Sequence, residues 1–379
     1  MNYLTVDLYN DFQCVADACP NTCCSGWAII IDDETHLKMI ENEKKLEMPA
    51  KDWLIEKNGT TCVKLDNNKC PMLTENGLCN VVLKLGPQYL SETCQIYPRI
   101  QKQYGNFIEV YLLLSCPQVI TKLMEKETVD IYVSKDNQPT INYPYNELYY
   151  FEVNVRTHIF NILKSTENIS LSARLFLVFN VLNHSIQMYQ NCQLDMDLFE
   201  RTCVKTNTLP YIETQLNNII DEQKRYELFK NIINIIGNHP TDNRFNKLVN
   251  DVAQYFNKNS FTQFKSDLIN FKQNFCAYYQ NFYTNYWIYR IFSGIISIPD
   301  YEKSKEMIIY FAIGFSLIQI ISMISFTNDD GLSKDKYINI ISCLDRTLEH
   351  NHPFRKQLIS EINRNGLISA AGLLIFIIS

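Results

Sequence analysis

Cysteine is the residue type whose number and spacing in this chain could do chemistry. Nine of the 13 cysteines lie between positions 14 and 116 of 379 residues, and Cys62 is the one of the nine that is poorly placed to join the others. Soft thiolates bind zinc, copper(I) or iron–sulfur clusters, and each ligand must first lose its proton. We therefore predict metal ligation by eight residues: Cys14, Cys19, Cys23, Cys24, Cys70, Cys79, Cys94 and Cys116.

The spacing of these cysteines excludes the commonest metal motifs. A zinc ribbon needs two pairs of cysteines that are each separated by two residues, and this region has no such pair, although looser zinc sites stay open. The cysteine runs of bacterial ferredoxins and of radical S-adenosylmethionine enzymes are absent as well. Cys19 and Cys23 would share a face of a helical turn, whereas the adjacent Cys23 and Cys24 are expected to point apart and to serve different metals, unless one is structural. Eight thiolates suffice for one four-iron cluster plus a structural site, or for two sites.

Four cysteines further along the chain are scattered and are predicted to be small buried apolar residues: Cys192, Cys203, Cys276 and Cys343. The chain opens without a basic segment followed by a long apolar run, so we expect a cytoplasmic protein, where thiols more often bind metal than form disulfides. A net charge of −6 and a pI near 5.6 argue against a nucleic-acid partner, because phosphate binding rests on basic surface.

Short, irregular elements are expected to position the cysteines. They comprise a strand at 25–31, a helix from Asp33 to Leu46, a strand at 61–66, a helical turn at 90–94 and a hairpin at 101–115. Beyond Pro117 the apolar residues recur with helical periodicity, interrupted by a polar linker at 132–143. The helices are predicted at 119–127, 148–165, 172–190, 211–236, 243–257, 261–292, 303–326, 334–350 and 354–365, with a core-docking helix at 367–379.

These elements predict a mainly α fold. A small cysteine-rich, irregular α/β module at residues 1–130 is expected to pack on an all-α domain at residues 131–379, which contributes to the substrate and cofactor cleft. Residues 307–326 form a run without charge that is long enough to cross a bilayer. Because this run carries Gln319 and three serines, we expect a buried central helix and no stable membrane insertion.

Several motifs are similar to those of a known family. The chain contains Phe-x-Cys, Ala-Cys-x-x-Thr-Cys-Cys-x-Gly-Trp, Cys-Pro-x-Leu-x-x-x-Gly-Leu-Cys, Leu-Ser-Glu-Thr-Cys-x-x-Tyr-Pro-Arg and Leu-Ser-Cys-Pro, at residues 12–14, 18–27, 70–79, 90–99 and 114–117. In this order they resemble the flagellin lysine-N-methylase family. The resemblance continues more weakly at Gln280–Tyr286 and at Arg346 to Asn351.

The resemblance implies a protein lysine N-methyltransferase that moves a methyl group from S-adenosylmethionine to lysines of flagellin. It also implies a [4Fe-4S] cluster in the cysteine region. Zinc is the alternative metal that the thiolate chemistry leaves open. No glycine-rich fingerprint follows a strand, so the sequence shows no ordinary Rossmann cofactor site. An unconventional cofactor site is therefore expected.

Lysine methylation requires a neutral amine, so the site must take a proton from a group whose ordinary pKa is near 10.4. The candidate catalytic residues are Tyr97, Arg99, Tyr286 and His350. The candidate cofactor-binding residues are Glu92, Arg99, Arg290 and Arg346. The structural alternatives are that Glu92 and Arg99 pair to brace the cysteine fold, that the tyrosines around Tyr286 belong to the core, and that His350 caps a helix.

Two other functions fit parts of the sequence. A non-enzymatic protein that chelates zinc or iron would explain the cysteines, but it would not need a long helical partner domain. A membrane-associated redox protein rests on residues 307–326 alone.

Overall fold

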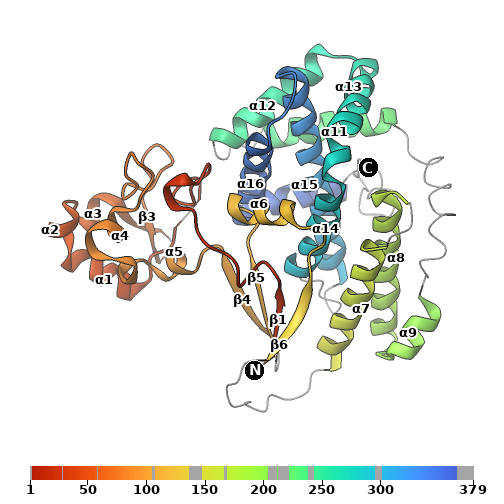
Figure 1. Cartoon of the computed structure of the whole chain (residues 1–379), viewed down its shortest axis with the longest axis horizontal. Coiled ribbons are helices and arrows are strands. Elements are labelled where there is room, and N and C mark those ends of the chain that lie inside the picture. Colours follow the sequence, from red (N-terminus) through yellow and green to blue (C-terminus); the bar gives the residue numbers. More distant parts are fainter. Residues whose placement is uncertain are drawn as a thin grey trace.

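The computed structural model describes residues 2–27, 29–57, 59–104, 107–135, 147–165, 169–203, 211, 222–237, 243–294 and 301–364. Figure 1 shows a cysteine-rich lobe at one side, a small sheet in the middle and a group of long helices at the other side. Helices dominate the described residues, which confirms the predicted mainly α fold with a small strand-containing module.

The central sheet has four strands in the order β4-β5-β1-β6. Its strands are β4 (Arg99–Tyr104), β5 (Phe107–Leu112), β1 (Asn2–Val6) and β6 (Ile131–Lys135). The β4–β5 pair is the predicted hairpin; β1 runs parallel to β5 and antiparallel to β6. The predicted linker was therefore wrong at 132–135, and residues 136–143 lie outside the described part. Both β1 and β6 are formed by pairing with strands far along the chain, which local sequence does not reveal.

The cysteine-rich lobe has a small hydrophobic core of its own, formed by residues between Ile29 and Val81 that include Met39, Trp53 and Met72. Its elements are α1 (Asp33–Glu41), α2 (Glu43–Leu46), α3 (Ala50–Trp53), β2 (Leu54–Lys57), β3 (Thr60–Val63), α4 (Asn80–Leu85), η2 (Pro87–Tyr89) and α5 (Glu92–Ile96); the single turn η1 (Ala16–Ala18) precedes them. Asp32 caps α1, and its side chain accepts a hydrogen bond from the backbone N–H of Thr35 at 2.9 Å.

The predicted strand at 25–31 was wrong. Ser25 and Ile30 make only isolated bridges, to Lys69 and Cys62. Gly26 has a φ of +84°, a left-handed conformation that interrupts an extended strand. The backbone around the cysteines is therefore irregular, and turns rather than a strand position the thiol groups.

The helical part forms the large hydrophobic core together with the central sheet. Its helices are α6 (Pro117–Glu125), α7 (Glu147–Leu163), α8 (Leu171–Gln190), α9 (Met196–Thr202), α11 (Glu222–Gly237), α12 (Asn243–Lys258), α13 (Phe261–Asn274), α14 (Gln280–Gly294), α15 (Tyr301–Asn328), α16 (Lys334–His350) and α17 (His352–Arg364). The predicted helix at 261–292 is broken at Phe275, which is buried against Phe271, and the single turn η4 (Cys276–Tyr279) follows. The helix predicted at 367–379 lies outside the described residues.

Helix α15 passes through the large core, as expected for the uncharged run. Within the described residues, 306–328 is the one helical segment with the length and mean hydropathy of a membrane span, and 94% of its most apolar window is buried by protein. Its polar side chains have protein neighbours; Gln319, for example, accepts a hydrogen bond from Cys276 at 3.5 Å.

A buried ion pair joins the sheet to α7. Glu109 of β5 is 0% exposed and contacts Arg156, which is 4% exposed, and the hydroxyl of Tyr149 donates to the same carboxylate at 3.1 Å. Removing one partner of such a pair leaves an uncompensated buried charge. The pair therefore fixes the helical part against the sheet.

We expect Glu109→Ala to lower the free energy of unfolding by about 3–5 kcal/mol, because Arg156 would remain buried without its anion. Chemical denaturation measures this loss. Lys164→Ala is the matched control, since it removes the pair with Asp130, whose side chain is 65% exposed, and should cost about 0–1 kcal/mol. Equal losses in the two variants would contradict a structural role for the buried pair.

Candidate cysteine-lined active site

One cavity of about 350 Å³ gathers most of the predicted cysteines. Its lining residues come from the cysteine-rich lobe, from the segment at 12–24 and from Cys116 and Pro117 at the start of α6. All 13 cysteines of the chain are free thiols. Seven of the eight predicted ligands line this cavity: Cys14, Cys19, Cys23, Cys24, Cys79, Cys94 and Cys116.

Three of these thiols stand at the beginnings of helices. Cys79 and Cys116 are the N-cap residues of α4 and α6, and Cys94 lies in the first turn of α5, where its backbone N–H donates to the hydroxyl of Ser91. Burial raises the pKa of Cys94 to about 11 and that of Cys116 to about 11. Both are therefore protonated near neutral pH and must lose a proton to bind metal.

Cys70 lies behind the cavity wall. It is buried in the small core of the lobe, and its backbone N–H donates to the carbonyl oxygen of Cys24 at 2.8 Å. Burial raises its pKa to about 12. Of the cysteines outside the predicted set, Cys203, Cys276 and Cys343 are buried as predicted, whereas Cys192 is exposed, in a turn after α8 with a φ of +55°.

Cys23 and Cys24 line the same cavity, contrary to the expectation that they point apart. That expectation applies to helix and strand, whereas these residues form a turn. A hydrogen bond from the Cys23 thiol, helped by Thr22 and the charge of Arg346, lowers the pKa of Cys24 to about 6, while the same interaction raises that of Cys23. Of the two thiols, Cys24 therefore loses its proton more readily.

In metal-free protein we expect Cys24 to be the cavity thiol that iodoacetamide alkylates fastest at pH 7. Its rate should fall as the pH drops through about 6, because the thiolate is the nucleophile. Cys94, with a pKa of about 11, serves as the comparison within the same molecule and should react slowly until the pH is alkaline. Quantitative peptide mapping measures both rates, and equal rates at pH 7 would contradict the assignment.

The cavity cysteines fit a soft metal centre, both because thiolates are soft ligands and because the thiols lie in one place. Seven uncrosslinked thiols share one cavity, and thiolates select zinc, copper(I) and iron–sulfur centres. Metal–thiolate bonds are about 2.3 Å long for zinc. In the described part of the chain no three His, Cys, Asp or Glu side chains already form a group that could hold a metal ion, so metal binding would require side-chain rotation to bring the sulfurs to a common centre.

Arg99 and Tyr97 also line the cavity, whereas Glu92 does not. The guanidinium group of Arg99 donates to the carbonyl oxygen of Phe12 at 3.0 Å and lies 5.1 Å from the centre of the Phe12 ring. Among the described residues no carboxylate lies within 4.0 Å of Arg99, so the bracing pair with Glu92 is not formed. The backbone N–H of Glu92 instead donates to Asp32.

A chain of hydroxyl groups leads from the cavity to His350. The Tyr97 hydroxyl lies 3.1 Å from the Ser115 hydroxyl, which lies 3.1 Å from Nε2 of His350. Trp27 stacks on the His350 ring at 4.7 Å between ring centres, and its indole N–H donates to the carbonyl oxygen of Cys23. Ser115 was not predicted; its place beside Cys116 in the Leu-Ser-Cys-Pro motif was the signal that could have found it.

Tyr286 and Arg290 lie elsewhere, in the helical core. The Tyr286 hydroxyl accepts a hydrogen bond from Arg290 at 3.1 Å, and Arg290 forms ion pairs with Asp345 and Glu349 of α16. Neither residue lines the cysteine cavity. The tyrosine stripe of α14 is buried core at Tyr286 and its neighbours, whereas Tyr278 before it is 82% exposed.

Arg346 and His350 are four residues apart on α16 and reach the site from one helix face. His350 completes the hydroxyl chain, and Arg346 donates to carbonyl oxygens of the cysteine loop, including those of Thr22 at 2.9 Å and Ser25 at 3.1 Å. The helical part therefore supplies part of the wall behind the thiols.

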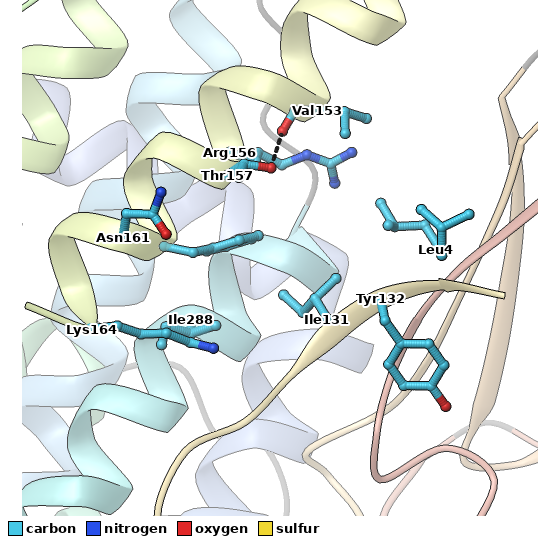
Figure 2. Close-up of a pocket in the computed structure, with 11 residues that line it drawn as sticks. Leu4, Ile131, Tyr132, Val153, Arg156, Thr157, Asn161, Lys164 and Ile288 are labelled. Carbon is cyan, nitrogen blue, oxygen red and sulfur yellow. Dashed lines mark hydrogen bonds between the residues drawn. The ribbon is translucent and has the colours of Figure 1, made fainter.

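A second cavity, of about 240 Å³, contains no cysteine. Figure 2 shows it between α7, which presents Arg156 and Thr157 and is followed directly by Lys164, and the strands β1 and β6, which present Leu4 and Ile131. Three of its polar lining side chains have protein partners: Arg156 pairs with Glu109, Thr157 donates to the carbonyl oxygen of Val153 at 2.9 Å, and Lys164 pairs with Asp130 at 3.0 Å. The chemistry-bearing residues are therefore concentrated in the cysteine-lined cavity.

Comparison with known proteins identifies the class. The model of the FliB lysine N-methylase C-terminal domain matches residues 156–376, more than half of the chain. The flagellar biosynthetic protein FliU of Salmonella muenchen is 34% identical over 120 residues, which cover 30% of this chain and 71% of that protein. The lysine-N-methylase of Salmonella typhimurium is 34% identical over 120 residues, covering 30% of this chain and 30% of that protein. No solved structure matches.

The matched model is that of a methyltransferase family. The chain belongs to the FliB lysine N-methylase family, which confirms the resemblance seen in the motifs. The alignment spans about three tenths of the length of the Salmonella lysine-N-methylases. Arg346 and His350 lie within the matched region, whereas the cavity cysteines precede it.

Proposed function

We propose that this protein transfers a methyl group from S-adenosylmethionine to lysine side chains of a flagellin-type protein. The observation that carries the proposal is the single cavity in which thiols, Arg99, Tyr97 and Trp27 meet. Family membership supplies the reaction class, and the name of the Salmonella muenchen relative supports a flagellar substrate.

The cavity suits the methyl donor in size and lining. Its volume of about 350 Å³ falls within the range of ligand pockets, roughly 300–1,000 Å³. Arg99 would bind the carboxylate of the methionine portion, because its guanidinium group has no carboxylate partner among the described residues. Trp27 and the apolar side chains of Leu83 and Leu90 would contact the adenosine and the sulfonium.

The reaction needs the substrate lysine as a free amine. The Tyr97 hydroxyl would accept the ammonium proton while passing its own proton to Ser115, which passes its proton to Nε2 of His350. Burial raises the pKa of Tyr97, so the phenol remains protonated at rest and acts as a relay. The amine then attacks the methyl carbon; the new C–N bond forms as the C–S bond breaks, and the electron pair stays on sulfur.

Cavity thiols would hold the proposed [4Fe-4S] cluster, with zinc as the alternative metal. The lining cysteines of the loop before Ser25, together with Cys94 and Cys116, supply the thiolates. A bound cluster would supply an open iron for the amino and carboxylate groups of methionine if three thiolates hold it, or a structural or redox centre if four do. Whichever set binds, the thiols occupy the same cavity as Arg99 and Tyr97.

Incubation of anaerobically purified protein with methyl-labelled S-adenosylmethionine and flagellin tests this proposal. We expect label in flagellin, at lysine side chains identified by mass spectrometry. A flagellin in which the labelled lysines are replaced by arginine is the control. Purified protein that binds metal but transfers no label to flagellin would contradict the proposed activity and favour the chelating alternative.

A further inference from the structure

Arg346 is the most heavily engaged polar side chain near the cysteines. It projects from α16 and is 4% exposed. Its Nη1 atom donates to the Asn21 side chain at 3.2 Å and to the carbonyl oxygens of Thr22 and Ser25, and its Nη2 atom donates to the carbonyl oxygens of Asn21 at 3.0 Å and Ser115 at 3.3 Å. One guanidinium group thus joins the loop that carries three cavity cysteines to the segment that ends at Cys116.

Among the residues that the structure describes, no carboxylate lies within 4.0 Å of the Arg346 guanidinium group. No Asp or Glu of the described residues forms an ion pair with it, and its Nε atom is buried without a hydrogen-bond partner. Arg290 on the neighbouring helix differs, because two carboxylates of α16 neutralise it. Burying an uncompensated cation is costly, so an anion is expected close to Arg346 when the protein is functional.

The groups that can supply this anion are the cavity thiols. Three of the carbonyl groups that bind Arg346 belong to residues next to Cys23, Cys24 and Cys116, and the fourth belongs to Asn21, two residues after Cys19. These sulfurs become anionic when they bind metal, and a centre with several thiolates carries net negative charge.

We infer that Arg346 is the buried counter-charge of the thiolate metal centre and positions the cysteine loop for metal binding. This inference rests on the proposed metal centre but not on methyl transfer. It makes Arg346 a positioning residue rather than a ligand for the cofactor carboxylate, because the carbonyl oxygens of the loop occupy both of its Nη atoms. The family-matched helical domain then stabilises a metal site whose ligands lie outside it.

Three substitutions separate charge from shape. Arg346→Gln removes the charge, and Arg346→Lys keeps it while losing the planar fork. Asn21→Asp retains the acceptor for Arg346 but places a carboxylate against it, which strengthens the contact and neutralises the charge. Arg244→Gln is the matched control, because Arg244 donates to the same Asn21 side chain and to Ser25 from an exposed position on α12.

The readout is metal bound per chain after anaerobic reconstitution with iron and sulfide, and its half-life against a chelator. We expect Arg346→Gln and Asn21→Asp each to shorten that half-life by at least about tenfold. The half-life for Arg346→Lys should lie between those of these two variants and that of the unsubstituted protein. The half-life for Arg244→Gln should stay within about twofold of the unsubstituted value. Thermal unfolding checks that each variant is folded, and Asn21→Asp remains informative where Arg346→Gln does not fold.

A folded Asn21→Asp protein that keeps metal as long as the unsubstituted protein would overturn the counter-charge role. Unsubstituted protein that takes up no metal would also overturn it. Metal retention that follows the expected order while flagellin stays unlabelled would support the inference and refute the proposed activity, so the two failures are distinguishable.

Discussion

Cys94→Ser is expected to abolish both metal binding and methyl transfer. Cys94 lines the cavity from the first turn of α5, together with thiols from the loop before Ser25 and from the start of α6. A serine hydroxyl remains protonated and is a poor ligand for a soft metal. Since residues that only support ligands contribute roughly 10- to 100-fold to metal affinity, loss of a ligand should cost more than about 100-fold.

The measurement is metal content and single-turnover methyl transfer on the same preparation. Cys276→Ser is the matched control, because Cys276 is buried in the helical core, where its thiol donates to Gln319. We expect the control to keep its metal and its activity. If the two variants retained equal amounts of metal, the cavity thiols would not form the metal centre.

Tyr97→Phe is expected to lower kcat by about 10²-fold near pH 7, because removal of a general acid–base group typically costs 10²- to 10⁴-fold. The substitution keeps the ring that packs 5.6 Å from Trp27 and removes the hydroxyl that reaches Ser115. The deficit should narrow as the pH rises toward 10.4, the ordinary pKa of lysine, because solvent then supplies the free amine. The KM for S-adenosylmethionine should change little.

Rate profiles over pH for Tyr97→Phe, Ser115→Ala and His350→Gln would test the relay as a unit. In all three variants the loss of rate relative to the unsubstituted enzyme should become smaller as the pH rises, since each substitution interrupts the same chain of contacts. Tyr278→Phe is the control, because its side chain is 82% exposed and lies outside the cavity. A Tyr97→Phe enzyme with an unchanged rate at every pH would eliminate the relay.

The sequence predicted the cysteine cavity better than the residues that surround it. Of the eight cysteines predicted from clustering along the chain, seven line the cavity, because so many soft donors rarely gather by chance. Cys70 joined the small core instead, since the distinction between a buried thiol and a lining thiol depends on packing. Ser115 has an ordinary side chain, and its role appears only when Tyr97 and His350 lie on either side of it.

Arg290 and Arg346 were both predicted to bind cofactor, and the structure gives each a different set of partners. The sequence shows that both residues carry a positive charge, but it does not show whether carboxylates or carbonyl oxygens surround that charge. Arg290 meets Asp345 and Glu349, whereas Arg346 meets the loop carbonyls more than 300 positions away in the chain. Strands β1 and β6 were not predicted for the same reason. β1 pairs with β5 and with β6, which lie more than 100 residues further along the chain.

The four-residue spacing of Arg346 and His350 links the two parts of the molecule. Through these side chains, α16 both supports the cysteine loop and ends the hydroxyl chain from Tyr97. A chelating module would not need this connection, whereas the proposed transferase would need its metal, methyl donor and proton acceptor held in fixed positions relative to one another. The arrangement explains why the long helical part accompanies the cysteines.

Iron and acid-labile sulfide analysis of anaerobically purified protein tests the central claim most directly. The account predicts brown protein that contains iron and sulfide in equal amounts, with visible absorbance that dithionite bleaches and that Cys94→Ser abolishes. Colourless protein with stoichiometric zinc and no labile sulfide would contradict the cluster. It would leave the cysteine-lined cavity as a zinc site.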